Sequence, residues 1–236
     1  MARLMSAALA LGVMLALSAC GSPEPAEPES AEPSAGAAGE AAEGVEPAGP
    51  DPATLTGAVE APWRDEQARA RDSARNPVET LEFFDIDPSG VVIEIWPGAG
   101  WYADILAPWV HGNGGIYVAA WPPVAETDTR AAQFRARFEA RFSGGARGEA
   151  RLAPFGPGAP ALAGALAETG PADAVLTFRN VHNFMAADFA EAAFDSFFQA
   201  LKPGGVLGVV EHRLPADRVQ DPRAASGYVQ QDYVIA

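Results

Sequence analysis

The sequence of 236 residues contains a single cysteine, Cys20, only three histidines, and no lysine or arginine between residues 21 and 60. The lack of other thiols excludes disulfides and a cysteine nucleophile from everything after residue 20. The formal net charge is −15, and residues 61–236 alone carry −7, from 22 acids against 15 bases. An acidic chain without a basic face argues against a nucleic-acid partner.

The first twenty residues hold one charged side chain, Arg3, followed by an uncharged apolar run over 4–19. That run is shorter than the roughly 20 residues of a membrane-spanning helix, and its layout is typical of a secretory signal peptide. It ends in LSACG at 17–21, which resembles the bacterial lipobox, where cleavage precedes a cysteine that receives lipid. We therefore predict a signal peptide over 1–20, lipidation of Cys20, and a lipid-anchored protein of the cell envelope that faces the periplasm. An ordinary signal peptide with an incidental cysteine is the alternative.

The next segment, 21–62, consists mainly of Pro, Glu, Ala and Gly, with nine acids and no base between 21 and 60. Such a segment buries too little apolar surface to offset the entropy lost on ordering. Charge repulsion and proline extend it further. We predict a disordered acidic tether over 21–62, followed by one folded domain over 63–236, which is long enough for a single core.

The folded part alternates short apolar runs with amphipathic segments. Strands are expected at 91–95, 115–120, 148–153, 172–178 and 206–211, and helices at 63–74, from 76 onward, at 101–110, 126–142 and 189–201, with another starting after 227. Asn76 and Glu79 have the spacing of a capping box around Pro77. In the last long helix, Phe197 and Phe198 are both expected to face inward. Strands without polar alternation, separated by helices, indicate a doubly wound, mostly parallel sheet covered on both faces.

The first strand ends in a glycine-rich bend, within VVIEIWPGAGWY at 91–102. Gly98 and Gly100 permit close backbone approach to a ligand, and the following helix directs its first amide groups toward the same space. GAGWYA at 98–103 also fits the loose dinucleotide pattern G-x-G-x-x-A. The acid expected about 20 residues later to hold a ribose is missing from 117–122. Trp96 is predicted to line a pocket at this strand end.

Polar side chains gather where the fourth and fifth strands end, and ligands bind at such carboxyl ends. They include Arg179, Asn180, His182, Glu211 and His212. We predict that His182 or Glu211 accepts a proton and that Arg179 or Asn180 orients the reacting molecule. A purely structural alternative is a buried Arg179–Glu211 pair, with His182 capping a helix. No metal site is predicted, because adjacent strand residues such as Glu211 and His212 point to opposite faces.

The motifs together resemble class I S-adenosylmethionine-dependent methyltransferases. EIWPGAG at 94–100 resembles their motif I, LKPGG at 201–205 is similar to a helix-to-strand turn common among them, and DAVLTF at 173–178 looks like their fourth strand. Over residues 72–236 the chain resembles a group of exported bacterial predicted methyltransferases.

This resemblance implies a Rossmann-like sheet and S-adenosylmethionine as cofactor. Gly98 and Gly100 would approach the methionine part of the cofactor, and Glu94 would organise the bend. Trp96 and Asn180 would complete the cofactor-binding residues.

The sequence also departs from that family. Trp96 stands in place of the usual first glycine, Ala120 stands near the usual ribose-binding acid, and residues 153–155 lack the acid often found near adenine. Since the family's sheet continues with a further helix and two strands, we expect the chain to be a fragment. The predicted function is methyl transfer to an unknown small molecule. A noncatalytic binding module of the same fold and a nicotinamide-dependent oxidoreductase are the alternatives.

Overall fold

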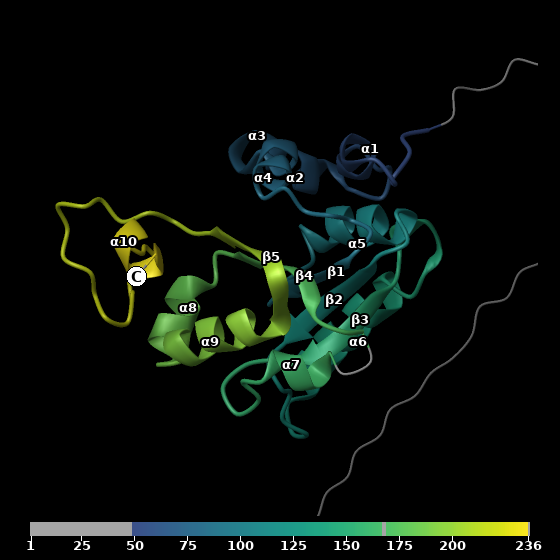
Figure 1. Ribbon diagram of the computed structural model, residues 1–236. Helices are drawn as coiled ribbons and strands as arrows, with labels where there is room; N and C mark the ends of the chain where they lie inside the picture. The colour runs from purple at the N-terminus through teal and green to yellow at the C-terminus, as the bar shows by residue number, and fades with distance from the viewer. Residues whose placement is uncertain (1–48, 167–168, 236) are drawn as a thin grey trace, which may run out of the picture. The chain divides into compact units, whose positions relative to one another are not determined.

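The computed structural model describes residues 49–166 and 169–235, so the predicted signal peptide, the lipidation site Cys20 and most of the predicted tether lie outside the described residues (Figure 1). The strands are β1 Val91–Ile95, β2 Ile116–Trp121, β3 Ala150–Pro154, β4 Ala172–Phe178 and β5 Leu201–Val210. The helices are α1 Leu55–Val59, α2 Glu66–Arg69, α3 Asp72–Arg75, α4 Pro77–Phe83, α5 Ala103–Gly112, α6 Thr129–Arg141, α7 Leu162–Ala165, α8 Val181–Ala186, α9 Ala190–Ala200 and α10 Gln231–Ile235, with a 3-10 turn at Gly145–Arg147. None of the helices in these two ranges has the length and apolar character needed to cross a bilayer.

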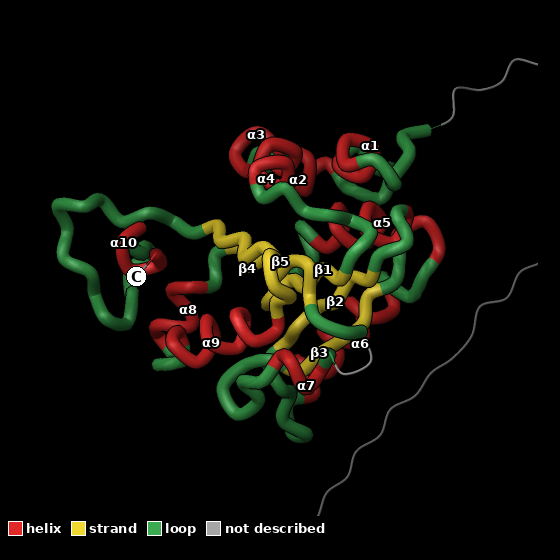
Figure 2. Tube along the Cα trace, viewed as in Figure 1, coloured by secondary structure: helices red, strands yellow, loops and turns green. Residues whose placement is uncertain are grey.

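The five strands form one parallel sheet in the order β3-β2-β1-β4-β5 (Figure 1). Figure 2 shows the strands in yellow and the helices around them in red. β1 lies at the centre, where Val92 pairs with Tyr117 on one side and with Ala174 on the other. The chain first builds outward through β2 and β3, then returns to place β4 and β5 beyond β1. The order therefore reverses between β1 and β4, and such a switch point is where open α/β sheets form ligand crevices.

Each face of the sheet is covered by its own helices, because consecutive residues of a strand point to opposite faces. Ile93 and neighbouring strand residues pack against α7, α8 and α9. Val92 and Tyr117 pack against α1, α4, α5 and α6 on the other face. Figure 1 shows α5 and α9 on opposite sides of the strands. The prediction of a doubly wound parallel α/β sheet is confirmed.

The predicted tether over 21–62 is wrong in its last part, because Leu55–Val59 form helix α1. The Thr54 hydroxyl accepts a hydrogen bond from the Gly57 amide at 3.0 Å and caps this helix. Gly57 and Ala58 are buried, and α1 packs on α5. The small side chains that gave the segment its tether-like composition are what permit this close packing.

The predicted strand over 206–211 begins five residues earlier, at Leu201. Leu201 pairs with Ala172 and Val206 pairs with Ala174, so the intervening residues bulge out of the ladder. The turn expected from proline and glycine is present, but it lies inside the strand rather than before it.

The predicted helix over 63–74 is divided into α2 and α3. Asn76 has a left-handed backbone, with φ of 43°, and its side chain makes no capping hydrogen bond, so the predicted capping box is wrong. The Thr80 hydroxyl donates instead to the Arg75 carbonyl oxygen at 3.2 Å. Pro77 occupies the first position of α4 as predicted.

Two neighbouring phenylalanines of α9 have opposite surroundings, although both were expected to face inward. Phe197 is fully buried against the rings of Phe155 and Phe184, whereas Phe198 is 82% exposed. We expect Phe197→Ala to lower the free energy of unfolding by about 3–5 kcal/mol, because it opens a cavity in the core. The matched variant Phe198→Ala should change it by less than about 0.5 kcal/mol. Urea unfolding followed by circular dichroism measures both, and equal losses would contradict this packing.

Candidate functional site

A cavity of about 610 Å³ opens at the switch point, beside the carboxyl ends of β1, β4 and β5. Its volume lies in the range of small-molecule sites. The segment containing α2 and α3 supplies its outer wall, and the start of α5 supplies another side. The lining residues are Arg71, Ala74, Arg75, Glu94, Trp96, Pro97, Gly98, Ala99, Trp101, Tyr102, Phe178, Arg179, Asn180, Val210, Glu211 and His212.

The glycine-rich bend faces this cavity through Gly98 and not through Gly100. Gly98 has a φ of +58°, and a β-carbon placed on it would have no neighbour within 4 Å. Gly100 also has a positive φ, but its β-carbon position lies 3.1 Å from the Phe138 ring. Of the two predicted glycines, Gly98 is therefore open to a ligand, while Gly100 serves the packing of the bend against α6.

Trp96 turns its indole toward the face opposite Glu94. Its φ of +49° is left-handed, which is rare for a bulky residue. The indole N–H donates to the Phe155 carbonyl oxygen at 2.9 Å, and the ring lies edge-on to Phe184 at 4.8 Å between centroids. Regular strand alternation would place residues 94 and 96 on the same face. The left-handed turn therefore directs the indole toward Phe155 and Phe184, and Trp96 also lines the cavity.

Glu94 is a buried acid beneath the bend. Its Oε2 accepts a hydrogen bond from the Tyr117 hydroxyl at 2.5 Å. Burial raises the pKa of Glu94 to about 8, against a smaller lowering by the Tyr117 hydrogen bond. Glu94 is consequently protonated at pH 7, and it lines the cavity as a neutral group.

The bend is also anchored to α6 by Arg141. The Arg141 guanidinium donates to the Ala99 carbonyl oxygen at 3.0 Å and forms an ion pair with Asp104 in the first turn of α5. Asp104 is buried, and its backbone oxygen accepts from the Trp63 indole at 3.1 Å. The acid lies where the helix dipole favours negative charge, so the start of α5 is fixed from two sides.

The predicted polar residues meet at the ends of β4 and β5, although they do not all reach the cavity. Glu211 lies on the cavity wall, and His182 lies behind it, with His182 Nδ1 at 3.0 Å from Glu211 Oε2. The structural alternative of an Arg179–Glu211 pair is wrong, since Glu211 pairs with His182. Arg179 is exposed on the cavity wall, with a left-handed φ of +62°. Within 49–166 and 169–235, no cluster of three potential metal-ligating side chains occurs.

Asn180 has a structural contact that the sequence did not indicate. Its side-chain amide donates to the Ile95 carbonyl oxygen at 2.9 Å, which joins the ends of β1 and β4. Asn180 is buried and also lines the cavity. Asn180 therefore lines the predicted site and also holds the two central strands together.

Sequence reasoning missed the wall formed by Arg71, Arg75 and the aromatic residues near them. The Arg75 guanidinium lies 4.4 Å from the centroid of the Trp101 ring, and Tyr102 stacks on Phe178 at 3.6 Å between centroids. The spacing of four residues between the two arginines places them on one side of a helix. That spacing was the available signal in the sequence.

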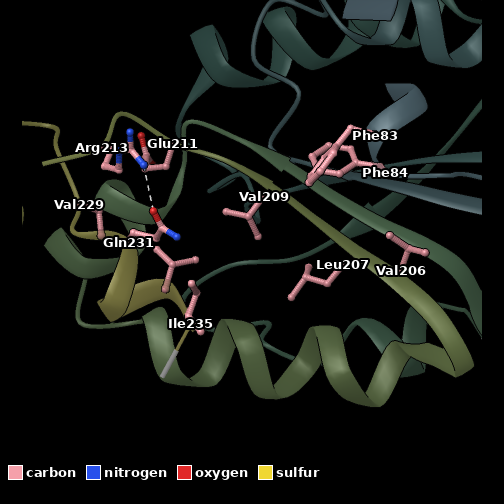
Figure 3. Close-up of a pocket in the computed structure, with 11 residues that line it drawn as sticks. Phe83, Phe84, Val206, Leu207, Val209, Glu211, Arg213, Val229, Gln231 and Ile235 are labelled. Carbon is pink, nitrogen blue, oxygen red and sulfur yellow. Dashed lines mark hydrogen bonds between the residues drawn. The ribbon is translucent and has the colours of Figure 1, made fainter. Parts of the chain in front are cut away.

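A second cavity, of about 540 Å³, lies against β5 on the far side of Glu211 from the first. Figure 3 shows Phe83, Phe84, Val209 and Ile235 around an apolar space, with the hydrogen bond from Arg213 to Gln231 at one end. That bond is 3.0 Å long. Glu211 lines both cavities, so the two cavities meet at this residue.

The raised pKa of Glu94 predicts a pH dependence of stability. The unfolded chain releases this proton near the ordinary value of 4.5, whereas the folded chain retains it up to about 8. Because the folded state binds more protons in that window, the free energy of unfolding should fall as pH rises from about 5 to 8, by about 1.4 kcal/mol per unit.

Glu94→Gln keeps a partner for Tyr117 and should remove most of that slope. Urea unfolding of both proteins at pH 5, 6.5 and 8 tests this. Parallel curves for the two proteins would show that Glu94 is ionised in the folded state.

The chain matches no protein-family model and no curated protein sequence. Among solved structures it is similar to a SAM-dependent methyltransferase from Aquifex aeolicus, with 16% identity and a TM-score of 0.47, over 78% of this chain and 84% of that one.

Two further solved structures are similar over part of their length. An O-methyltransferase family protein from Burkholderia thailandensis has 22% identity and a TM-score of 0.42, over 70% of this chain and 44% of that one. The glycopeptide N-methyltransferase MtfA, complexed with S-adenosyl-L-methionine, has 18% identity and a TM-score of 0.39, over 65% and 57%. The chain thus spans about half the length of these two proteins. Each TM-score is below 0.5, and the fold assignment rests on the parallel sheet and its strand order.

Proposed function

We propose that this chain is an S-adenosylmethionine-dependent methyltransferase acting on a small molecule. The observation that carries the proposal is the cavity at the switch point, where Gly98 leaves open space beside the strand end. When bound, the cofactor would supply an electrophilic methyl group, whose bond to sulfur breaks as a bond to the acceptor forms and the sulfur keeps the electron pair. The resemblance of residues 94–100 to motif I supports the same assignment.

The residues around the cavity fit the amino-acid end of such a cofactor. Arg75 offers a planar donor pair to a carboxylate. The rings of Tyr102 and Phe178 stack on each other and supply an apolar wall for the body of the ligand. Glu94, protonated at pH 7, supplies a neutral polar floor. The fit thus rests on one cationic side chain, two rings and a bend without side-chain obstruction.

The end of β2 contributes no carboxylate to a ribose, since Ala120 and Trp121 stand there. The Trp96 indole, bonded to the Phe155 carbonyl oxygen, crosses from the end of β1 to the residue after β3. This observation favours the second candidate function, a binding module that retains the fold and carries out no methyl transfer.

Glu211 is the group that we assign as base. Its carboxylate lines the cavity, so it is placed to accept the proton that the acceptor loses during transfer. His182 contacts Glu211 from behind at 3.0 Å, and the His182 amide also donates to Glu211 Oε2 at 3.3 Å. His182 is therefore a positioning residue for Glu211, while Arg179 and Asn180 orient the molecule that binds beside them.

We further propose that the protein is exported and anchored at Cys20, facing the periplasm. The support is the charged start, the apolar run over 4–19 and the LSACG motif at 17–21. Metabolic labelling of the cloned full chain with a tritiated fatty acid, compared with Cys20→Ser, is the direct check. Equal labelling of both proteins would overturn the anchor.

Titration calorimetry with S-adenosylmethionine, its demethylated product S-adenosylhomocysteine and NAD tests the proposed function. We expect the first two compounds to bind and NAD not to bind. Gly98→Ala should weaken binding about tenfold, because it places a methyl group in the open space at the bend. The matched control Gly158→Ala also alters an open, positive-φ glycine, but outside the cavity lining. It should leave the affinity unchanged.

Three results would contradict this assignment. Binding of none of the compounds supports the binding module, and binding of NAD alone supports an oxidoreductase. Equal losses for Gly98→Ala and Gly158→Ala would move the binding site away from the bend.

The assignment of the base has a separate test. With a tritiated methyl donor and a small-molecule extract of the cell envelope, Glu211→Gln should lower methyl transfer at least 100-fold. His182→Gln should lower it less and shift its pH profile. Both variants should bind S-adenosylhomocysteine as the unaltered protein does, and His111→Gln, at an exposed histidine of α5 outside the cavity lining, serves as the control. Full transfer by Glu211→Gln would exclude Glu211 as the base.

A further inference from the structure

Three arginines converge on the main cavity from two distant parts of the chain. Arg71 directly precedes α3, Arg75 is the last residue of α3, and Arg179 follows β4. They lie close enough to act on one another, since the pKa of Arg75 is lowered by burial and then by the charges of Arg71 and Arg179. None of the three forms an ion pair with a carboxylate in the described ranges.

The acids near this wall are already committed elsewhere. Asp72 receives two hydrogen bonds from Arg64, at 2.5 and 3.0 Å. Glu94 is protonated at pH 7, and Glu211 is held by His182. The lining residues therefore carry a net charge of about +2 at neutral pH with His212 neutral. This positive patch occurs in a chain whose formal net charge is −15.

Packing holds Arg75, the most buried of the three arginines, in place. The Trp101 indole donates to the Ala68 carbonyl oxygen at 2.9 Å, so α2 is tied to the start of α5. The Arg75 guanidinium lies over the Trp101 ring, and the Arg75 carbonyl oxygen accepts from Thr80. Arginines that are held in this way lose less freedom when they bind an anion.

We propose that this cationic wall binds an anionic group of the methyl acceptor, a carboxylate or a phosphate. The inference rests on the proposed function, in which the methionine carboxylate of the cofactor neutralises only one of the three guanidinium charges. Arg71 and Arg179 are exposed on the cavity wall, so their guanidinium groups remain open to a second anion. Tyr102 and Phe178 line the same cavity, so the body of the acceptor that carries the anion is apolar or aromatic.

The proposal is tested with three ring compounds of similar size. The purified full chain, saturated with S-adenosylhomocysteine, is titrated with benzoate, phenyl phosphate and the neutral benzamide, and tryptophan fluorescence reports binding beside Trp101. We expect one or both anions to bind at least tenfold more tightly than benzamide, and more weakly at high salt. The ratio between benzoate and phenyl phosphate identifies the preferred anion.

Variants locate the binding. Arg179→Gln and Arg71→Gln should each weaken anion binding about tenfold and leave the affinity for S-adenosylhomocysteine within about twofold. The control is Arg137→Gln, an exposed arginine of α6 outside the cavity lining. It should change neither affinity.

Three outcomes overturn the proposal. They are equal binding of benzamide and the anions, unchanged anion binding in both cavity variants, and displacement of S-adenosylhomocysteine by the anions, which would show that the wall serves the cofactor alone. Failure of the unaltered protein to bind S-adenosylhomocysteine, with arginine-dependent anion binding retained, would refute the methyltransferase and leave the anion site standing.

Discussion

The site depends on the divergence of two hydrogen-bonded neighbours, β1 and β4, at their carboxyl ends. Beyond β1 the chain turns to α5 on one face, and beyond β4 it turns to α8 on the other. Both exits pass through a left-handed residue, Trp96 after β1 and Arg179 after β4. Asn180 holds the two ends together through the Ile95 carbonyl oxygen. The crevice is thus a consequence of strand order, and its opening is fixed by a single amide contact and two unusual backbone turns.

The order of strands and helices followed from the sequence because it depends on local patterns. The run 172–178 was placed to the residue, and the bend after 95 was placed at the correct edge. The pattern of apolar residues did not predict burial correctly where two adjacent apolar residues fitted the helical periodicity equally well. Phe197 and Phe198 are adjacent, and only the position of α9 over the sheet decides which one is buried. The helix α1 was missed because a segment rich in alanine and glycine has the composition of a linker, and only its packing on α5 makes it a helix of the core.

At the site, the sequence identified which residues meet but not how they point. Glu211 and His182 were treated as alternatives for one role, and the structure places one on the wall and the other behind it. Gly100 and Gly98 looked equivalent in the motif, yet only Gly98 borders open space. Arg179 was predicted at the site, but its place beside Arg71 and Arg75 was missed, because those two lie more than 100 residues earlier in the chain and no local pattern joins the two segments.

The positive charge of the cavity depends on Glu94 remaining protonated. Glu94 lies within the same lining as three arginines, and as a carboxylate it would offset part of their field. Burial raises the pKa of Glu94 and holds it protonated at neutral pH despite the hydrogen bond from Tyr117, so Glu94 adds no negative charge to offset the arginines. A local positive field in an acidic protein concentrates anions at one place on its surface and repels them elsewhere.

Trp96 shows how a departure from a motif is accommodated by the fold. Glycine adopts a left-handed backbone without penalty, whereas a bulky residue there costs on the order of 1–3 kcal/mol. The indole offsets part of that cost through its hydrogen bond to the Phe155 carbonyl oxygen and its contact with Phe184. Because these contacts lie on the opposite face from Glu94, the side chain that looked like an obstruction leaves the space at Gly98 open. The hydrogen bond from Trp96 to Phe155 also ties the end of β1 to the residue after β3. Tryptophan in place of glycine therefore makes this bend more rigid.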